Sequence, residues 1–157
     1  LETLRSVSNL AIEQVEKNIV YQHADILTLH LPLSPKTRHL FDHSVLKQMK
    51  SSAYLLNYAR GEIVDEVALY QALLEQKIAG AVLDVFEKEP YQGPLTDLEN
   101  IVLTAHMGSC AEDCRFQMEL QATQEIIRFF QNQPLQHEVP WEEYAFQSVL
   151  EEIDLSQ

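Results

Sequence analysis

Glycine is scarce in this chain of 157 residues, which contains only Gly61, Gly80, Gly93 and Gly108. No two of them have the spacing of G-x-G-x-x-G, the turn that lets a dinucleotide pyrophosphate approach the N-terminus of a helix. Any dinucleotide site in this sequence therefore lacks that turn. Because the chain also begins at Leu1 and not at methionine, we expect it to be the C-terminal part of a longer protein that supplies the turn.

Cysteine is rarer still, and the two cysteines, Cys110 and Cys114, are too few for a disulfide scaffold. A reduced, cytoplasmic setting is the default for such a composition. The two cysteines lie one helical turn apart without further cysteine or closely spaced histidine, so we expect packing residues and no metal site. Long apolar runs and a signal peptide are also absent, so we expect no membrane contact.

Positive charge is limited to 11 lysine and arginine residues against 24 acidic ones, which gives a formal net charge of −13. Nucleic-acid binding requires clustered lysine and arginine to contact phosphates, and here these residues are scattered. The composition therefore excludes a nucleic-acid partner. An anionic small molecule would have to be held by a local cation, and Arg60 is the candidate.

Short apolar runs alternate with helical patterns along the chain. Strands are predicted at residues 24–30, 53–57, 80–85 and 101–104. Helices are predicted within 1–21, at 44–49 with Ser44 near the N-cap, at 65–77 with Asp65 as the cap and Lys77 in the last turn, and at 110–131. This alternation predicts an α/β fold with a Rossmann-like, doubly wound parallel sheet that is incomplete and covered on both faces. We assign residues 1–133 to this domain and residues 134–157 to a tail.

Three motifs each follow one of the predicted strands. They read Asn-Tyr-Ala-Arg-Gly at residues 57–61, Asp-Val-Phe-Glu-Lys-Glu-Pro at residues 84–90 and Thr-Ala-His-Met-Gly-Ser at residues 104–109. The carboxyl ends of parallel strands meet at one edge of a sheet, and ligands bind there. An arginine, a carboxylate and a histidine at that edge would form an anion clamp beside an oriented acid/base.

In their order, spacing and context, these motifs resemble the D-2-hydroxyacid dehydrogenase family, which includes the 3-phosphoglycerate dehydrogenases, over residues 24–130. The resemblance implies an NAD-dependent enzyme that transfers a hydride between nicotinamide and a D-2-hydroxy acid. The segment at residues 104–109 most resembles the phosphoglycerate-dehydrogenase-like branch of the family. By itself, the fragment is expected to be inactive, and its longer parent is expected to form a homodimer. In the family the chain returns to the substrate domain, so the tail from Pro134 is expected there.

Arg60, Glu89 and His106 are the expected catalytic residues. The guanidinium of Arg60 can hold a carboxylate through two hydrogen bonds and polarise the reacting carbonyl. The imidazole of His106 can give a proton to that carbonyl or take it back. A carboxylate on the other ring nitrogen would fix the tautomer and favour the protonated ring. Glu89 is chosen for this role over Glu87 because it directly precedes proline, and Glu87 is expected to face solvent.

The resemblance also implies a set of cofactor-binding residues: Leu31, Pro32, Thr37, Ala59, Arg60, Asp84, His106, Gly108 and Ser109. Asp84 ends an apolar strand, where an unpaired carboxylate would be costly. In the family this aspartate binds the nicotinamide carboxamide. The alternative is that Asp84 caps a helix or pins a loop.

Two other functions fit the same fold. One is an NAD(H)-sensing binding protein without turnover, like the transcriptional corepressors that resemble this family. The other is a structural remnant that binds nothing. The presence of all three catalytic residue types favours an enzyme over both.

Overall fold

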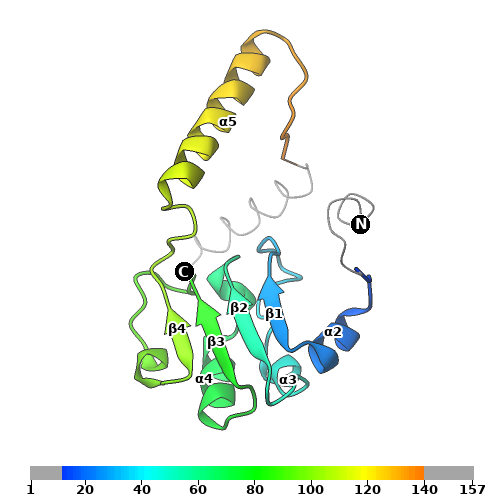
Figure 1. The fold of residues 1–157 in the computed structure, drawn as a ribbon, viewed down its shortest axis with the longest axis vertical. Coiled ribbons are helices and arrows are strands. Elements are labelled where there is room, and N and C mark those ends of the chain that lie inside the picture. The colour runs from blue at the N-terminus through cyan, green and yellow to red at the C-terminus, as the bar shows by residue number, and fades with distance from the viewer. Residues whose placement is uncertain (1–11, 140–157) are drawn as a thin grey trace.

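The computed structural model describes residues 12–139, and its centre is a four-stranded parallel sheet (Figure 1). The strands β1 (Ile26–Leu29), β2 (Tyr54–Asn57), β3 (Gly80–Leu83) and β4 (Ile101–Leu103) lie side by side in the order of the sequence. Asn57 pairs with Leu83, and Leu83 pairs with Leu103, so β2, β3 and β4 end at one level. The predicted α/β parallel sheet is confirmed.

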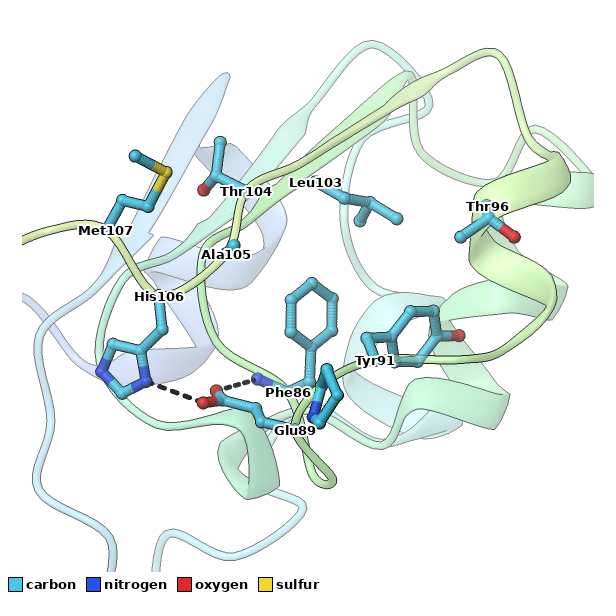
Figure 2. A pocket seen from close by; sticks show the side chains of 10 residues that line it. Phe86, Glu89, Tyr91, Thr96, Leu103, Thr104, Ala105, His106 and Met107 are labelled. Atoms are coloured by element: carbon cyan, nitrogen blue, oxygen red, sulfur yellow. Dashed lines mark hydrogen bonds and ion pairs between the residues drawn. The ribbon is translucent and has the colours of Figure 1, made fainter.

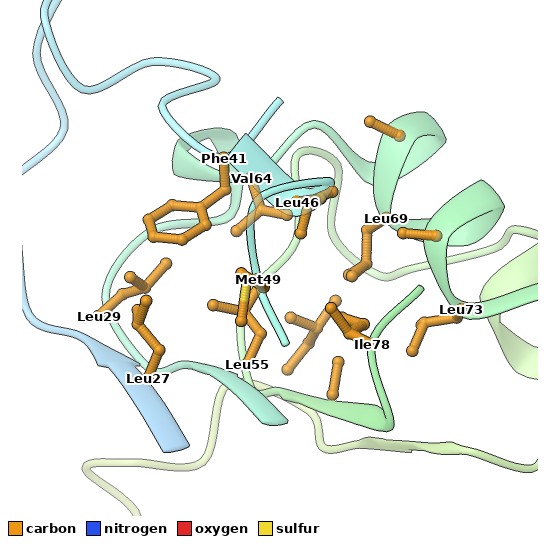
Figure 3. Close-up of a cluster of buried hydrophobic side chains, with 14 of the residues drawn as sticks. Leu27, Leu29, Phe41, Leu46, Met49, Leu55, Val64, Leu69, Leu73 and Ile78 are labelled. Carbon is orange, nitrogen blue, oxygen red and sulfur yellow. The ribbon is translucent and has the colours of Figure 1, made fainter. Parts of the chain in front are cut away.

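The helices are α2 (Lys17–His23), α3 (His43–Leu46), α4 (Glu66–Leu74) and α5 (Glu112–Phe130), with two short 3-10 turns, η1 (Gly61–Ile63) and η2 (Pro94–Asp97). The main core lies where α3 and α4 pack against one face of the sheet (Figure 3). It includes Leu46, Leu55, Leu69 and Leu73, each at most 1% exposed. Full burial of a leucine side chain contributes about 1.5–3 kcal/mol.

The opposite face of the sheet differs from the prediction. Ile26, Tyr54 and Val102 point away from this core and are 66%, 49% and 57% exposed. Within residues 12–139, helices therefore cover one face and leave apolar side chains on the other. The apolar strand pattern indicated two covered faces, because a sequence pattern does not tell which segment does the covering.

Helix α4 begins as predicted and ends earlier. Asp65 accepts hydrogen bonds from the backbone N–H groups of Val67 and Ala68, both at 3.0 Å, which confirms it as the cap. The helix ends at Leu74, because Gln76 adopts a left-handed conformation with φ 54° and the N–H of Lys77 returns to the carbonyl of Ala72 at 2.8 Å. The prediction that Lys77 lies in the last turn was therefore wrong.

The shorter helices also begin at different residues from those predicted. Asp42, and not Ser44, caps α3, and its carboxylate accepts bonds from the Val45 N–H at 3.0 Å and the Ser44 hydroxyl at 2.7 Å. These bonds, led by that from Ser44, lower the pKa of Asp42. Near the N-terminus the described helix is α2, which starts at Lys17, later than expected. The predicted helical residues 1–11 lie outside the described part.

Helix α5 extends away from the sheet (Figure 1). Its apolar side chains include Phe116, Leu120, Ile127 and Phe130, and all four are exposed. None of the helices within residues 12–139 is long and apolar enough to cross a bilayer. Most of the predicted tail, residues 140–157, lies outside the described range, so its path stays a prediction.

Candidate functional site

Arg60 is presented by a tight turn at the end of β2. Asn57, with no exposed surface, stabilises this turn from inside. Its side-chain oxygen accepts the N–H of Ala59 at 3.0 Å, and its amide nitrogen donates to the carbonyl of Arg60 at 2.9 Å. Arg60 itself is exposed, and its Nη1 donates to the Ala59 carbonyl at 2.7 Å. The guanidinium therefore stands at the open carboxyl edge of the sheet, while Ala59 is buried beneath it.

Asp84 lies at the end of β3 and is only 4% exposed. Its Oδ1 accepts hydrogen bonds from the hydroxyl of Thr104 and from the N–H of Met107, the latter at 2.8 Å. Its Oδ2 accepts the N–H of Gly108 at 2.9 Å. Burial opposes ionisation, but these hydrogen bonds outweigh it and hold the pKa of Asp84 below its usual value. Asp84 thus pins the loop that follows β4, as in the alternative reading of this residue.

The cofactor role of Asp84 remains compatible with these contacts. A carboxylate oxygen can accept two hydrogen bonds, so Oδ2 can take a donor in addition to Gly108. Gly108 and Ser109 follow in the same loop and are exposed. Whether these three residues bind the nicotinamide stays a prediction.

His106 is held in an unusual backbone conformation. Its φ of 52° lies in the left-handed region, which costs a non-glycine residue on the order of 1–3 kcal/mol. The N–H of His106 donates to the carbonyl of Asp84 at 2.7 Å, which ties this conformation to the end of β3. Strained positions of this kind cluster at functional sites.

The side chains of His106 and Glu89 face one another (Figure 2). Nδ1 of His106 lies 2.9 Å from Oε2 of Glu89, while Oε1 of Glu89 accepts the N–H of Phe86 at 3.1 Å. The hydrogen bond with His106 is the main cause that lowers the pKa of Glu89; burial acts against it, and the Phe86 bond adds to it. The second ring nitrogen of His106 points away from Glu89 (Figure 2). This arrangement fixes one nitrogen and leaves the other for a ligand.

Glu87 has different partners. Its Oε1 lies 3.1 Å from Nε2 of His39 and accepts the N–H of Glu66 at 3.3 Å. Glu87 is exposed, as expected, but its side chain is also bonded to His39 and to the backbone of Glu66. Of the two glutamates, Glu89 is the one that contacts His106.

A cavity of about 800 Å³ borders the His106–Glu89 pair (Figure 2). It lies between β4 and the loop after β3, and its wall includes Phe86 and Tyr91, whose rings stack with centroids 4.6 Å apart. This cavity was not predicted from the sequence. Its only signal in the sequence is the pair of aromatic residues on either side of the Glu-Pro step.

The loop after β1 contains the other predicted cofactor residues. The hydroxyl of Thr37 donates to the carbonyl of Pro32 at 2.7 Å and accepts the N–H of Ser34 at 2.8 Å, so it closes this loop on itself. Leu31 is 38% exposed at the end of β1. Within residues 12–139, no hydrogen bond or ion pair connects Leu31, Pro32 or Thr37 with His106. Their role in cofactor binding stays a prediction.

The two cysteines do not pack as expected. Cys110 and Cys114 are both exposed, so the interpretation of them as packing residues was wrong for the described part of the chain. Among residues 12–139, no group of three or more histidine, cysteine and acidic side chains could hold a metal ion. That the protein uses no metal stays a prediction.

Comparison with known proteins agrees with this geometry. The family model described as the D-isomer specific 2-hydroxyacid dehydrogenase, NAD binding domain, matches residues 2–108. A glyoxylate reductase of Aeropyrum pernix is 46% identical over 112 residues, which cover 70% of this chain and 33% of that protein. A D-3-phosphoglycerate dehydrogenase of Methanocaldococcus jannaschii is 44% identical over 109 residues, 68% of this chain and 21% of that protein.

Solved structures give the same result. A glyoxylate reductase from Paecilomyes thermophila superposes with a TM-score of 0.77 at 31% identity, over 82% of this chain and 39% of that one. The NAD-complexed D-isomer specific 2-hydroxyacid dehydrogenase from Lactobacillus delbrueckii gives 0.69 at 32% identity, over 76% and 41%. The chain spans about a third of the length of the glyoxylate reductases that it matches. It belongs to the D-isomer specific 2-hydroxyacid dehydrogenase family, in which it matches the domain that binds NAD.

Proposed function

We propose that this chain supplies the acid/base and substrate-binding part of the active site of an NAD-dependent D-2-hydroxyacid dehydrogenase. The observation that carries this proposal is the 2.9 Å contact between His106 Nδ1 and Glu89 Oε2 at the edge of the sheet where Arg60 is also presented. An oriented histidine beside an exposed guanidinium suits a substrate that has both a carboxylate and a carbonyl.

The roles follow from the charges of these groups. Arg60 binds the substrate carboxylate and draws electron density from the neighbouring carbonyl. Bound NADH would supply the hydride that reduces this carbonyl. The carbon–oxygen double bond becomes single, and the oxygen takes a proton from the ring nitrogen of His106 that points away from Glu89. Glu89 retains the proton on Nδ1 and stabilises the charged ring before transfer. In the oxidative direction the same nitrogen accepts the proton.

The residues present fit one half of the cofactor. Asp84 has remaining acceptor capacity at the carboxyl edge, and the backbone near Ala59, Gly108 and Ser109 lies in the turns on either side of it. These groups suit the nicotinamide and its carboxamide. The pyrophosphate would need the glycine turn that this sequence lacks, so a longer protein would complete the site.

For the substrate, a small 2-oxo acid such as glyoxylate or hydroxypyruvate is favoured. Among residues 12–139, no lysine or arginine lines the cavity beside His106 and Glu89. A phosphorylated substrate, as the name of the phosphoglycerate dehydrogenase relative indicates for that protein, would need its phosphate partner elsewhere in the longer protein. Homodimer formation and a cytoplasmic location stay predictions.

A binding protein that only senses NAD(H) would not require the His106–Glu89 pair, and no observation favours it. The test begins with this chain alone, titrated with NADH by fluorescence and assayed with glyoxylate, hydroxypyruvate and phosphohydroxypyruvate. We expect weak NADH binding and no turnover. Micromolar affinity for NADH with steady turnover would contradict the proposal that this chain holds only half of the cofactor site. In the longer protein, His106→Ala should abolish turnover in both directions and spare NADH binding. Undiminished turnover in that variant would contradict the proposed mechanism.

A further inference from the structure

The loop after β3 is fastened to the start of α4 by two glutamates that bind one another's backbone. Oε1 of Glu66 accepts the N–H of Glu87 at 2.7 Å. In return, Oε1 of Glu87 accepts the N–H of Glu66 at 3.3 Å. The two residues are 21 positions apart in the sequence, so this pair of hydrogen bonds joins two separate segments.

A third segment also contacts this loop. Nε2 of His39 lies 3.1 Å from Oε1 of Glu87. The backbone N–H of His39 donates to the carbonyl of Glu62 at 2.7 Å, and its φ is 49°, in the left-handed region. Glu87 is therefore held by His39 and Glu66 together.

The position of Glu89 depends on this loop. Its carboxylate bonds to the N–H of Phe86 within the loop and to His106 across it. Glu89 and His106 are 39% and 52% exposed, and an ion pair as exposed as this contributes about 0–1 kcal/mol, too little to organise a loop by itself. The geometry of the pair must therefore come from whatever fixes residues 86–89.

Glu66 occupies its position at an electrostatic cost. Burial raises the pKa of Glu66, and the nearby carboxylates of Glu87, Glu62 and Asp65 raise it further, while the hydrogen bond from the Glu87 N–H acts in the opposite direction. Four acidic side chains within one small region repel one another. The hydrogen bond from the Glu87 N–H is the favourable contact that offsets this repulsion at Glu66.

We propose that Glu66 is a positioning residue for His106: by holding the N–H of Glu87 it fixes the loop from which Glu89 orients the imidazole. The inference rests on the proposed function, since it assigns Glu66 a part in the acid/base pair. The competing explanation is purely structural, because an acidic residue in the first turn of a helix stabilises the helix dipole. Stabilising the helix dipole depends on the negative charge of Glu66. Positioning the loop depends instead on whether the side chain is long enough to reach the N–H of Glu87.

Two substitutions separate reach from charge. Glu66→Asp keeps the charge in the first turn of α4 but shortens the side chain by one methylene, so it should release the N–H of Glu87. Glu66→Gln keeps the length and an acceptor oxygen but removes the charge. Glu75→Asp is the matched control, since Glu75 lies at the other end of α4, where its carboxylate is 3.8 Å from Lys77 Nζ.

The readout is the tautomer of neutral His106 in this chain, measured from the ¹⁵N chemical shifts of its ring nitrogens. A carboxylate at Nδ1 selects the form protonated on Nδ1. We expect that form to dominate in the wild type, in Glu66→Gln and in Glu75→Asp. In Glu66→Asp it should become the minor form, as it should in Glu89→Ala, which removes the carboxylate outright.

The outcomes are distinct. An unchanged tautomer in Glu66→Asp, or an equal change in Glu66→Gln or Glu75→Asp, would overturn the positioning role of Glu66. An unchanged tautomer in Glu89→Ala would instead show that the His106–Glu89 pair of the proposed function is wrong. Amide hydrogen exchange of Glu87 in the wild type gives a second test that needs no variant. Protection is expected there, and exchange as fast as in an open loop would overturn the proposal.

Discussion

Gly61 packs so closely against Phe86 that there is no room for a side chain at position 61. A Cβ placed there would lie 1.9 Å from the carbonyl carbon of Phe86 and 2.1 Å from its oxygen. Gly61 directly follows Arg60, and Phe86 starts the loop that carries Glu89. The turn that presents Arg60 and the loop that presents Glu89 therefore form one packed unit, and a displacement of either segment should move the other.

Gly61→Ala should destabilise the protein, because the backbone of Phe86 cannot move aside as a flexible side chain would. We expect the free energy of unfolding in urea to fall by about 1–3 kcal/mol, the usual cost of overpacking. Gly108→Ala is the control, since a Cβ there would meet its nearest atom, Oδ2 of Asp84, at an ordinary 3.4 Å. Equal losses in the two variants would contradict the close contact between Gly61 and Phe86.

Asn57→Ala should loosen the turn that presents Arg60. It leaves the N–H of Ala59 and the carbonyl of Arg60 without their partner, and each lost buried bond costs about 1–3 kcal/mol. Urea unfolding should show a clear loss of stability. Asn100→Ala, which removes a single bond of 3.2 Å to the Leu73 carbonyl, should cost less. The reverse order would argue against Asn57 as the organiser of the turn.

Asp84→Asn should destabilise the protein most at neutral pH. The pKa of Asp84 is lowered in the folded state, so the charged form stabilises the fold above the usual carboxyl range, and this contribution is lost as the pH falls through the lowered pKa. The amide cannot accept the bonds from Thr104, Met107 and Gly108 together, and we expect a loss on the order of 1–3 kcal/mol at pH 7.

This difference between wild type and Asp84→Asn should narrow in acid, as measured by urea unfolding over a series of pH values. Asp25→Asn serves as the control, because Asp25 is 78% exposed and its pair with Lys50 contributes at most about 1 kcal/mol. A constant loss for Asp84→Asn from neutral to acidic pH would contradict the stabilising role of its charge.

Arg60→Lys, made in the longer protein, should weaken substrate use although it keeps the charge. A lysine cannot reproduce the planar fork that binds a carboxylate through two bonds. We expect kcat/KM to fall by an amount on the order of 2–4 kcal/mol, with NADH binding nearly unchanged. Arg38→Lys is the control, because the guanidinium of Arg38 lies 4.0 Å from Glu62 and has no assigned part in substrate binding. A lysine at position 60 without cost would show that Arg60 does not hold the substrate.

Much of the fold followed from local signals in the sequence. The four strands were visible as short apolar runs, and Asp65 could be identified as a helix cap, because both depend on neighbouring residues. The end of α4 could not be predicted, since it depends on Gln76, a residue with no strong preference for the left-handed conformation. The exposed face of the sheet was also missed, because apolar runs do not reveal what lies against them.

Some residues of the candidate site could likewise be identified from the sequence, and others could not. The motifs identified Arg60, Glu89 and His106 as candidates, and the structure shows that Glu89 and His106 are in contact. Glu66 and His39 carried no such signal, because they reach Glu87 through contacts between segments far apart in the sequence. The contacts of Asp84 with the loop after β4 likewise required the folded chain, in which three hydrogen-bond donors converge on one carboxylate.

The most direct test of the central claim is kcat/KM for reduction of the oxo acid by Glu89→Gln in the longer protein, measured beside Glu87→Gln. Reduction of the oxo acid needs the protonated His106 ring, which the Glu89 carboxylate stabilises. The kcat/KM of Glu89→Gln for this reduction should therefore fall, while Glu87→Gln, whose side chain contacts His39 and not His106, should leave it unchanged. A loss of kcat/KM in Glu87→Gln without one in Glu89→Gln would contradict the pairing of Glu89 with His106.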